Sequence, residues 1–408
     1  MRICFVSRRF FPAISGMSIY AINLLRQLVA RGHDVTMISQ YRGDEFGKGV
    51  YGGGPPPDVP GVKVIGLEQL GEQQANDGGL ANFERDIDTM VTAIMAEHEI
   101  APFDVLHAQY GYPTGWATLL AGQKLGLPVV VSIQGGDGHW VGSCCETHRE
   151  AMVRVLDHAD AVLIGGESFA REVHERLGTP MGRFTYIPGA VDTQRFTPGT
   201  QGSDDAIRIL YHGRVDRRKG VLDFIEACAR LTGNWRATIS GIGPDLEPAK
   251  ALVAERGLDD RIVFTGYADY ADVPQIYRGH HIFASPTYAE GFSNTILEAM
   301  AIGLAIVSCH AVGVSDCLRD GENGLLVQPG DIAAQAEALQ LLIDNRGERQ
   351  RLADAGLTEC RNTYSWDVVG GLIAGVYDEV AGSGAPDAFD PDLPEDPDCR
   401  FRAEPHLL

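Results

Sequence analysis

Short apolar runs alternate with amphipathic stretches along the whole chain. Strands are expected, among other places, over residues 3–7, 105–107 and 129–133, and residues 18–31 carry isoleucine and leucine at helical spacing. Several of the expected strands are continuous apolar runs, which are typical of parallel strands covered by helices on both faces. The pattern therefore predicts an α/β protein with doubly wound parallel sheets.

The alternation is interrupted at residues 198–205, where the sequence PGTQGSDD has no apolar anchor and is typical of a linker. The same alternation then restarts. We therefore expect two Rossmann-like domains, residues 1–197 and 206–365, followed by a last amphipathic helix at 366–380. The remaining segment, 381–408, holds five prolines and seven acids against two arginines, and it is expected to be disordered.

Length, composition and charge limit the classes of function. The 408 residues, 44% of them hydrophobic, suffice for two domains with real cores. The sequence has neither a run of about 18 apolar residues nor a signal peptide, so a cytoplasmic protein is expected. A net charge of −21 argues against nucleic acid as a partner. Membrane association is not favoured either, because the first 195 residues are also acidic overall.

The cysteines carry little signal in the sequence. They occupy positions 4, 144, 145, 228, 309, 317, 360 and 399, and no CxxC pair occurs. This scatter predicts neither a zinc site nor a disulfide framework. The neighbouring Cys144 and Cys145 are interpreted as two small buried residues, with a redox role as the alternative.

The most informative stretch is EGFSNTILEA, which runs from Glu290 to Ala299. A loop turns through Gly291, and a helix is expected to begin near Asn294. Helix N-termini bind phosphate because their backbone N–H groups and the helix dipole face it. With Glu290 before this site and Glu298 one turn into the helix, the stretch favours a ligand with hydroxyls on both sides of a phosphate, namely a nucleotide-sugar. The alternative is a plain capping box, TILE, which needs no ligand.

A second cluster, HGRVDRRKG, follows the first expected strand of the second half. Arg214 and Lys219 stand where strand ends meet ligands in such sheets, and they suit diphosphate recognition. For Arg217 and Arg218 we favour an exposed surface turn. The later SGIGPD stretch is interpreted as a tight strand-to-helix turn rather than as a phosphate site.

The first half offers weaker candidates. Residues 11–16 lack the GxGxxG pattern, so no NAD-type pyrophosphate loop is expected there. His107 ends a strand and is a candidate for a sugar or acceptor contact, with a purely structural role as the alternative. Gln134 and Asp137 lie in a glycine-rich loop that follows another strand and that could admit a sugar.

Taken together, these motifs resemble the family 4 glycosyltransferases, which are retaining enzymes of the GT-B fold with two Rossmann-like domains facing each other across a cleft. The resemblance runs from Met1 to about Val380. Its most specific part is the E-x7-E element formed by Glu290 and Glu298, and it also includes DVLHAQY, IPGAVDTQRFTP and DGENGLLVQPGD. The chain departs from the family pattern at QGGD, where an amide replaces a histidine contact to the sugar, at PGAVD and at the Ser15–Gly16 pair.

The resemblance implies roles for individual residues. Arg214 and Lys219 would bind the donor diphosphate, Glu290 the sugar hydroxyls and Glu298 the ribose. Further contacts would come from the backbone at Phe292, Ser293, Asn294 and Thr295, from Gly16 beside the donor phosphate, and from His107, Gln134 and Asp137 toward sugar and acceptor. The final helix would cross back onto the first half.

The implied reaction transfers a hexosyl or N-acetylhexosaminyl group to an acceptor hydroxyl with retention, without a bound metal or other cofactor. A UDP-sugar donor is favoured, with a GDP-sugar as the alternative. The acceptor is a saccharide, a lipid-linked molecule or a small molecule, and a homodimer is left open. The alternatives are a nucleotide-sugar epimerase of the same fold and an inactive partner subunit, against which the intact Glu290, Glu298, Arg214 and Lys219 argue.

Overall fold

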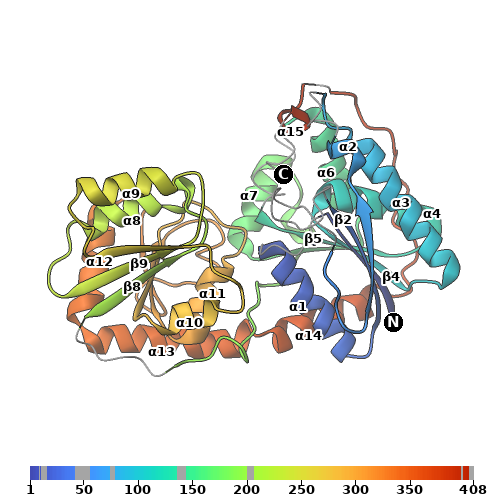
Figure 1. Cartoon of the computed structure of the whole chain (residues 1–408). Helices are drawn as coiled ribbons and strands as arrows, with labels where there is room; N and C mark the ends of the chain where they lie inside the picture. The colour runs from blue at the N-terminus through green and yellow to red at the C-terminus, as the bar shows by residue number, and fades with distance from the viewer. Residues whose placement is uncertain are drawn as a thin grey trace. The chain divides into compact units, whose positions relative to one another are not determined.

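The computed structural model describes residues 1–8, 10, 16–41, 56–73, 79–135, 144–199, 206–396 and 398–403 (Figure 1). The chain forms two compact units. Unit 1 comprises Met1–Pro188 together with Gly370–Leu408, and unit 2 comprises Gly189–Val369. No helix in the described ranges is both long enough and apolar enough to cross a membrane.

Unit 1 is built on a seven-stranded sheet in the order β3-β2-β1-β4-β5-β6-β7, with parallel pairing between all neighbours. Its strands are β1 (Arg2–Ser7), β2 (Asp34–Tyr41), β3 (Val62–Glu68), β4 (Val105–Gln109), β5 (Val129–Ile133), β6 (Ala161–Ile164) and β7 (Phe184–Tyr186). Its main helices are α1 (Gly16–Ala30), α3 (Phe83–Ile100), α4 (Trp116–Leu125), α6 (Glu146–His158) and α7 (Glu167–Leu177), with the short α2 (Leu70–Gln73) and α15 (Arg400–Ala403). Helix α14 (Trp366–Val380) begins in unit 2 and ends in unit 1.

Unit 2 repeats the architecture with a six-stranded parallel sheet in the order β10-β9-β8-β11-β12-β13. Its strands are β8 (Ile207–His212), β9 (Trp235–Ser240), β10 (Ile262–Gly266), β11 (Ile282–Ser285), β12 (Ala305–Cys309) and β13 (Leu325–Val327). Its helices are α8 (Val221–Cys228), α9 (Leu246–Glu255), α10 (Val273–Arg278), α11 (Asn294–Ile302), α12 (Ile332–Asp344) and α13 (Arg346–Thr363). The strand order reverses between β8 and β11, and ligands of such sheets bind beyond the strand ends at that point.

The core of unit 2 explains why its strands are continuous apolar runs. Along β11, Ile282 and Ala284 belong to one buried cluster, whereas Phe283 between them belongs to another. Successive side chains of a strand point to opposite faces, so both faces of this sheet are covered. The predicted α/β class with doubly wound parallel sheets is therefore confirmed.

The boundary between the units lies nearer the N-terminus than the polar linker suggested. Val191 forms a parallel bridge with Ser365, and its backbone N–H donates to Tyr364 O at 2.8 Å. Phe196 is buried in a cluster of unit 2. Because this segment packs in unit 2, the unit begins at Gly189 and not after 197.

The prediction of a disordered C-terminal segment is wrong for its described residues, which lie on unit 1 (Figure 1). Thr147 donates its hydroxyl to Pro394 O at 2.6 Å, and the ring of Phe389 packs against that of Trp116 with centroids 5.5 Å apart. Phe401 is only 2% exposed. The segment docks because a few of its apolar side chains pack against unit 1, although its composition as a whole is acidic and proline-rich.

Candidate functional site

Carboxylates brace the loop that follows β8. Asp216 accepts hydrogen bonds from the guanidinium of Arg218, at 3.1 and 2.7 Å, and from its backbone N–H at 2.9 Å, and these bonds lower the pKa of Asp216 to about 2. The Nε atom of Arg214 lies 3.4 Å from the same carboxylate. Asp245 binds Arg217 in the same way, through its backbone N–H and Nη2, both at 2.7 Å. Arg217 and Arg218 thus hold the loop in shape, which is more than the exposed turn that we expected.

Lys219 takes no part in these ion pairs, and its side chain reaches the loop between β11 and α11. Its Nζ atom lies 2.7 Å from Oε1 of Glu290 and donates to Ala289 O at 3.1 Å. The next residue, Gly220, has φ +72°, and a Cβ there would lie 2.0 Å from Pro286 O. Only glycine allows the two loops to approach this closely. The structure therefore brings together two of the three residues predicted to be catalytic.

Backbone contacts fix the position of Glu290. Its N–H donates to Val312 O at 2.9 Å. Gly313 has φ +74°, and a Cβ there would lie 2.4 Å from Glu290 O. Gly313 was missed in the sequence, although a glycine shortly after a predicted strand is the signal that could have found it.

Helix α11 begins four residues after Glu290, and its N-terminus lacks a side-chain cap. It begins at Asn294 with Ser293 as its N-cap residue, and the Ser293 side chain makes no capping bond. Its Oγ lies instead 3.2 Å from Oγ1 of Thr295. The ring of Phe292 packs against Tyr364, with centroids 5.8 Å apart. The first turn of α11 thus keeps backbone donors for an anion.

Glu298 lies one turn into α11 and does not form the capping box. Its Oε2 accepts a hydrogen bond from the hydroxyl of Tyr277 at 3.0 Å. Burial raises the pKa of Glu298 to about 7. Tyr277, on α10, is fully buried, and its ring lies edge-on to His212. Nothing in the local sequence singled out Tyr277, because its role depends on packing between distant segments.

The SGIGPD stretch, which was interpreted as a tight turn, packs closely against the loop after β8. Gly241 has φ +142°, and a Cβ there would lie 1.8 Å from Gly213 O. A Cβ on Gly243 would lie 2.2 Å from Val215 O. These glycines let the ends of β8 and β9 continue side by side, which positions the cationic loop.

The candidates of unit 1 are less uniform. His107 is completely buried, with Nδ1 2.5 Å from the hydroxyl of Tyr377 and Nε2 2.7 Å from Oγ of Ser132. Burial lowers the pKa of His107 to about 3. Since both ring nitrogens are engaged inside the core, the predicted sugar or acceptor contact of His107 is wrong, and its role is structural.

The other site residues predicted in unit 1 are Gly16, Gln134 and Asp137, and they remain predictions. Gly16 is exposed at the first position of α1. Gln134 is partly exposed after β5, and its Oε1 accepts from Nε2 of Gln109 at 3.3 Å. Asp137 lies outside the described residues.

Two family models match consecutive parts of the chain. Residues 15–190 match the glycosyl transferase 4-like domain, and residues 193–358 match glycosyl transferases group 1. The chain belongs to the group 1 glycosyltransferases. The junction of the two matches coincides closely with the boundary between units 1 and 2. The predicted family 4 resemblance is thereby confirmed.

Several curated relatives carry related names. The glycosyltransferase is 32% identical to an alpha-D-kanosaminyltransferase of Streptomyces kanamyceticus over 44% of this chain and 47% of that protein. It is 25% identical to a D-inositol 3-phosphate glycosyltransferase of Acidothermus cellulolyticus over 89% of this chain and 85% of that protein.

Solved structures confirm the GT-B fold. Sucrose-phosphate synthase from Thermosynechococcus elongatus matches with a TM-score of 0.78 at 22% identity, over 94% of this chain and 99% of that one. Anabaena HepE in complex with UDP matches with a TM-score of 0.74 at 16% identity, over 93% and 100%.

The arrangement in unit 2 of the glycosyltransferase has a definite chemical capacity. The cations Arg214 and Lys219 and the N-terminus of α11 attract anions. The carboxylates of Glu290 and Glu298 accept hydrogen bonds from hydroxyl groups. Such a site suits a molecule that carries phosphate and several hydroxyls.

Proposed function

We propose that this glycosyltransferase transfers a sugar from a nucleoside-diphosphate sugar to an acceptor hydroxyl with retention of the anomeric configuration. The observation that carries the proposal is the 2.7 Å pair between Lys219 and Glu290, which lies in the loops next to the uncapped start of α11. This pair offers one group for phosphate and one for sugar hydroxyls. The family membership supports the same reaction class.

The donor is held in three parts. Arg214, whose side chain is largely exposed, and Lys219 bind the diphosphate with charge-assisted hydrogen bonds. Glu290 accepts hydrogen bonds from the transferred sugar, and Glu298 accepts them from the ribose. The backbone from Phe292 to Thr295 completes the contacts to phosphate and sugar.

We favour UDP as the nucleotide, with GDP as the alternative. The support is that HepE, which has a similar fold, is described in complexes with UDP and with UDP-glucose. A hexosyl or N-acetylhexosaminyl group is transferred. From unit 1 we assign Gly16 to a contact beside the donor phosphate, and Gln134 and Asp137 to contacts with the sugar and the acceptor, as the family resemblance implies.

The protein groups act by stabilising charge. As the glycosidic bond breaks, negative charge grows on the leaving diphosphate, and Lys219, Arg214 and the α11 dipole stabilise that charge more strongly than they stabilise the ground state. The leaving phosphate oxygen accepts the proton of the attacking hydroxyl on the same face of the sugar. This route needs no dedicated protein base. The two cations take the place that a divalent metal would have at the diphosphate.

The acceptor is proposed to be a small polyhydroxylated molecule. The names of the relatives include transfer involving inositol 3-phosphate and transfer of kanosamine. Inositol 3-phosphate is therefore the first acceptor to try, ahead of lipid-linked and polysaccharide acceptors.

The decisive experiment has two stages. A thermal-shift screen with UDP, GDP, ADP and TDP and their sugars identifies the donor, since a ligand at 100 times its dissociation constant stabilises by about 2.7 kcal/mol. Product NMR with the best donor then reports the anomeric configuration, in buffer with and without added Mg²⁺. Inversion, or a strict need for Mg²⁺, would contradict the proposed mechanism. Epimerisation of the donor without acceptor would favour the epimerase instead.

A further inference from the structure

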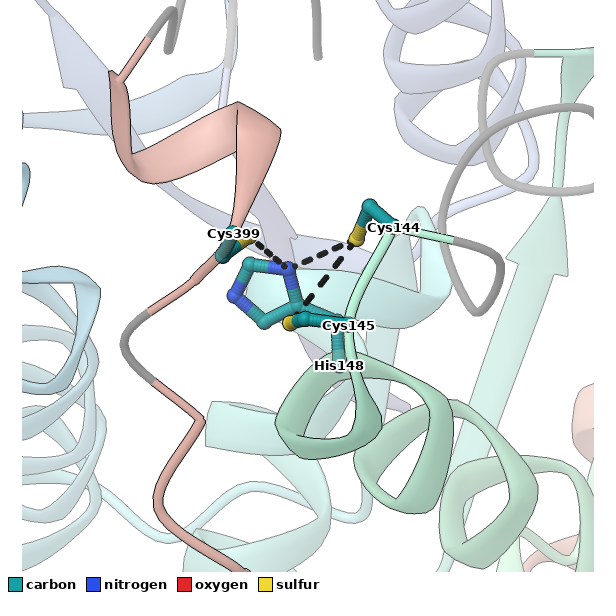
Figure 2. Close-up of side chains that lie close together, drawn as sticks. All are labelled: Cys144, Cys145, His148 and Cys399. Carbon is teal, nitrogen blue, oxygen red and sulfur yellow. Dashed lines mark hydrogen bonds between the residues drawn. The ribbon is translucent and has the colours of Figure 1, made fainter.

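A cluster of three cysteines and one histidine lies in unit 1, outside the donor site of unit 2. It consists of Cys144, Cys145, His148 and Cys399, whose potential ligand atoms all lie within 4.8 Å of one another (Figure 2). Cys144 and Cys145 directly precede α6, His148 is in the first turn of α6, and Cys399 directly precedes α15. We propose that this cluster is a structural zinc site that fastens the C-terminal segment to unit 1.

The distances suit one tetrahedral ion. Nδ1 of His148 lies 3.1 Å from Sγ of Cys144 and 3.5 Å from Sγ of Cys399, and the sulfurs of Cys144 and Cys145 are 4.0 Å apart. With Zn–S bonds of about 2.3 Å and Zn–N bonds of about 2.0 Å, a tetrahedral site has S···S distances of about 3.8 Å and S···N distances of about 3.5 Å. Small shifts of the side chains would therefore seat the ion.

The chemistry of the donors favours zinc among common metals. Three thiols and one imidazole form a closed Cys₃His set, which is typical of structural zinc and leaves no open position for a substrate. Binding releases the protons of the three thiols, since thiolates are the ligands.

The histidine is already oriented for this role. His148 is completely buried, and its ring lies 4.4 Å from that of Tyr112 and 5.5 Å from that of Phe83, measured between centroids. Figure 2 shows Nδ1 directed at the sulfurs of Cys144 and Cys399. Its Nε2 has no hydrogen-bond partner in the described part of the chain, so aromatic packing fixes the ring.

Metal-free explanations account for the cluster less well. A neutral Nδ1 accepts one hydrogen bond, yet two thiols face it. A Cys144–Cys145 disulfide would need the sulfurs to approach from 4.0 Å to about 2.05 Å. A single ion uses all four ligand atoms at once.

The spacing of the cysteines does not predict this site, and the proposal departs from the expectation of no zinc. The motif is CCxxH without a CxxC pair, and the fourth ligand, Cys399, follows His148 by 251 residues. Only the path of the C-terminal segment along unit 1 brings it near. On that path Asp396 accepts from Glu146 N at 3.0 Å, and Arg402 pairs with Glu84 at 2.6 Å. The ion would add to these contacts in holding the C-terminal segment on unit 1.

The test is metal analysis of the full chain, purified under reducing conditions without chelator. We expect one zinc ion per chain by elemental analysis and native mass spectrometry. Cobalt substitution should give thiolate charge-transfer bands and the intense visible bands of a tetrahedral ion. Cys399→Ser should lose most of the zinc. The matched control is Cys360→Ser, because Cys360 is a buried cysteine of unit 2 whose sulfur faces Leu297 O at 3.6 Å, and this variant should keep its zinc.

A second readout covers the case in which Cys399→Ser does not fold. In the wild-type protein, the thiols of the cluster should resist alkylation until a strong chelator is added, and mass spectrometry should then map the new adducts to Cys144, Cys145 and Cys399. The proposal is overturned if the wild-type chain contains no zinc, if Cys399→Ser retains it fully, or if a disulfide among these cysteines is found. Because these readouts are independent of turnover, they do not depend on the proposed function.

Discussion

The ammonium group of Lys219 lies 2.7 Å from a carboxylate oxygen of Glu290, and this pair joins the loop after β8 to the loop before α11. Three features allow the contact. Arg217 and Arg218 are held by Asp245 and Asp216, which fixes the loop after β8, and the Lys219 side chain reaches the neighbouring loop. Gly220 then permits the close approach of the two loops. The cation and the carboxylate are therefore positioned before any ligand binds.

Lys219→Ala should be the most damaging single change that leaves the fold intact. A charge-assisted hydrogen bond in such a site contributes about 1.5–3 kcal/mol, which corresponds to roughly 10- to 150-fold. Because the charge on the diphosphate grows toward the transition state, kcat should fall more than donor affinity. Lys219→Arg should rescue only part of the activity, since a planar fork does not replace a compact ammonium.

Lys250→Ala is the matched control for this experiment. Lys250 forms an exposed pair with Glu247 at 2.7 Å on α9, and such pairs contribute little. Steady-state kinetics on the three variants tests the assignment. It fails if Lys219→Ala keeps more than half of the wild-type kcat, or if Lys250→Ala is the more damaging change.

Glu290→Gln and Glu298→Gln should separate the sugar from the nucleotide. Glu290 is assigned to the transferred sugar, which UDP lacks, so Glu290→Gln should lower turnover strongly while UDP affinity changes little. Glu298 is assigned to the ribose, so Glu298→Gln should weaken both UDP and the UDP-sugar. Calorimetry with both ligands measures the difference. Similar behaviour of the two variants would refute this division of roles.

Glu298 should also make the stability of unit 2 depend on pH. Its pKa is raised to about 7 by burial, so between the ordinary carboxyl value of 4.5 and 7 the folded chain binds more protons than the unfolded chain. Stability from this group is therefore present below pH 4.5 and is lost as the pH rises toward 7. The loss is on the order of 1–3 kcal/mol. Urea titrations should show that wild type loses more stability than Glu298→Gln between pH 5 and 7. Parallel curves for the two proteins would contradict the raised pKa.

Arg218→Ala should destabilise unit 2, although the sequence alone suggested a neutral surface position. Asp216 is 3% exposed and takes two hydrogen bonds of at most 3.1 Å from the Arg218 guanidinium. Leaving this carboxylate with fewer partners costs about 1–3 kcal/mol. Arg171→Ala, which breaks an exposed pair with Glu167, serves as the control and should be nearly neutral. Chemical denaturation compares them, and equal stability of the two variants would show that Arg214 compensates.

Local patterns predicted the sheets and part of the proposed donor site, and the remaining features depended on contacts between distant segments. Lys219 and Glu290 could be singled out because both follow expected strands and lie in motifs that are visible in the local sequence. Tyr277 was not, since a buried tyrosine on a helix looks like core until its hydroxyl is seen against Glu298. His107 misled for the opposite reason. It ends a strand, as ligand contacts often do, yet Tyr377 from the far end of the chain covers it.

The C-terminal segment illustrates the same limit most clearly. Average composition predicts disorder when a segment has little apolar surface to bury. Residues 381–403 meet that description as a whole, but a few of their apolar side chains pack against unit 1. Phe389 lies against the rings of Trp116 and His158, and Cys399 and Phe401 are almost completely buried. Composition averages over positions, whereas docking depends on a few of them.

Phe401→Ala should therefore lower the stability of unit 1. The side chain is 2% exposed, and it lies on α15 beside Arg402, whose carbonyl accepts from Ala81 N at 2.8 Å. Truncating a buried phenylalanine costs about 3–5 kcal/mol in a well-packed core. Because this peripheral segment can detach locally, we expect a loss near the lower end of that range. Glu395→Gln, at an exposed position of the same segment, is the control and should be nearly neutral. Limited proteolysis adds a local readout, because detachment should expose the segment to cleavage before unit 1 unfolds. If Phe401→Ala melts and is cleaved like Glu395→Gln, docking of the segment contributes nothing to the stability of unit 1.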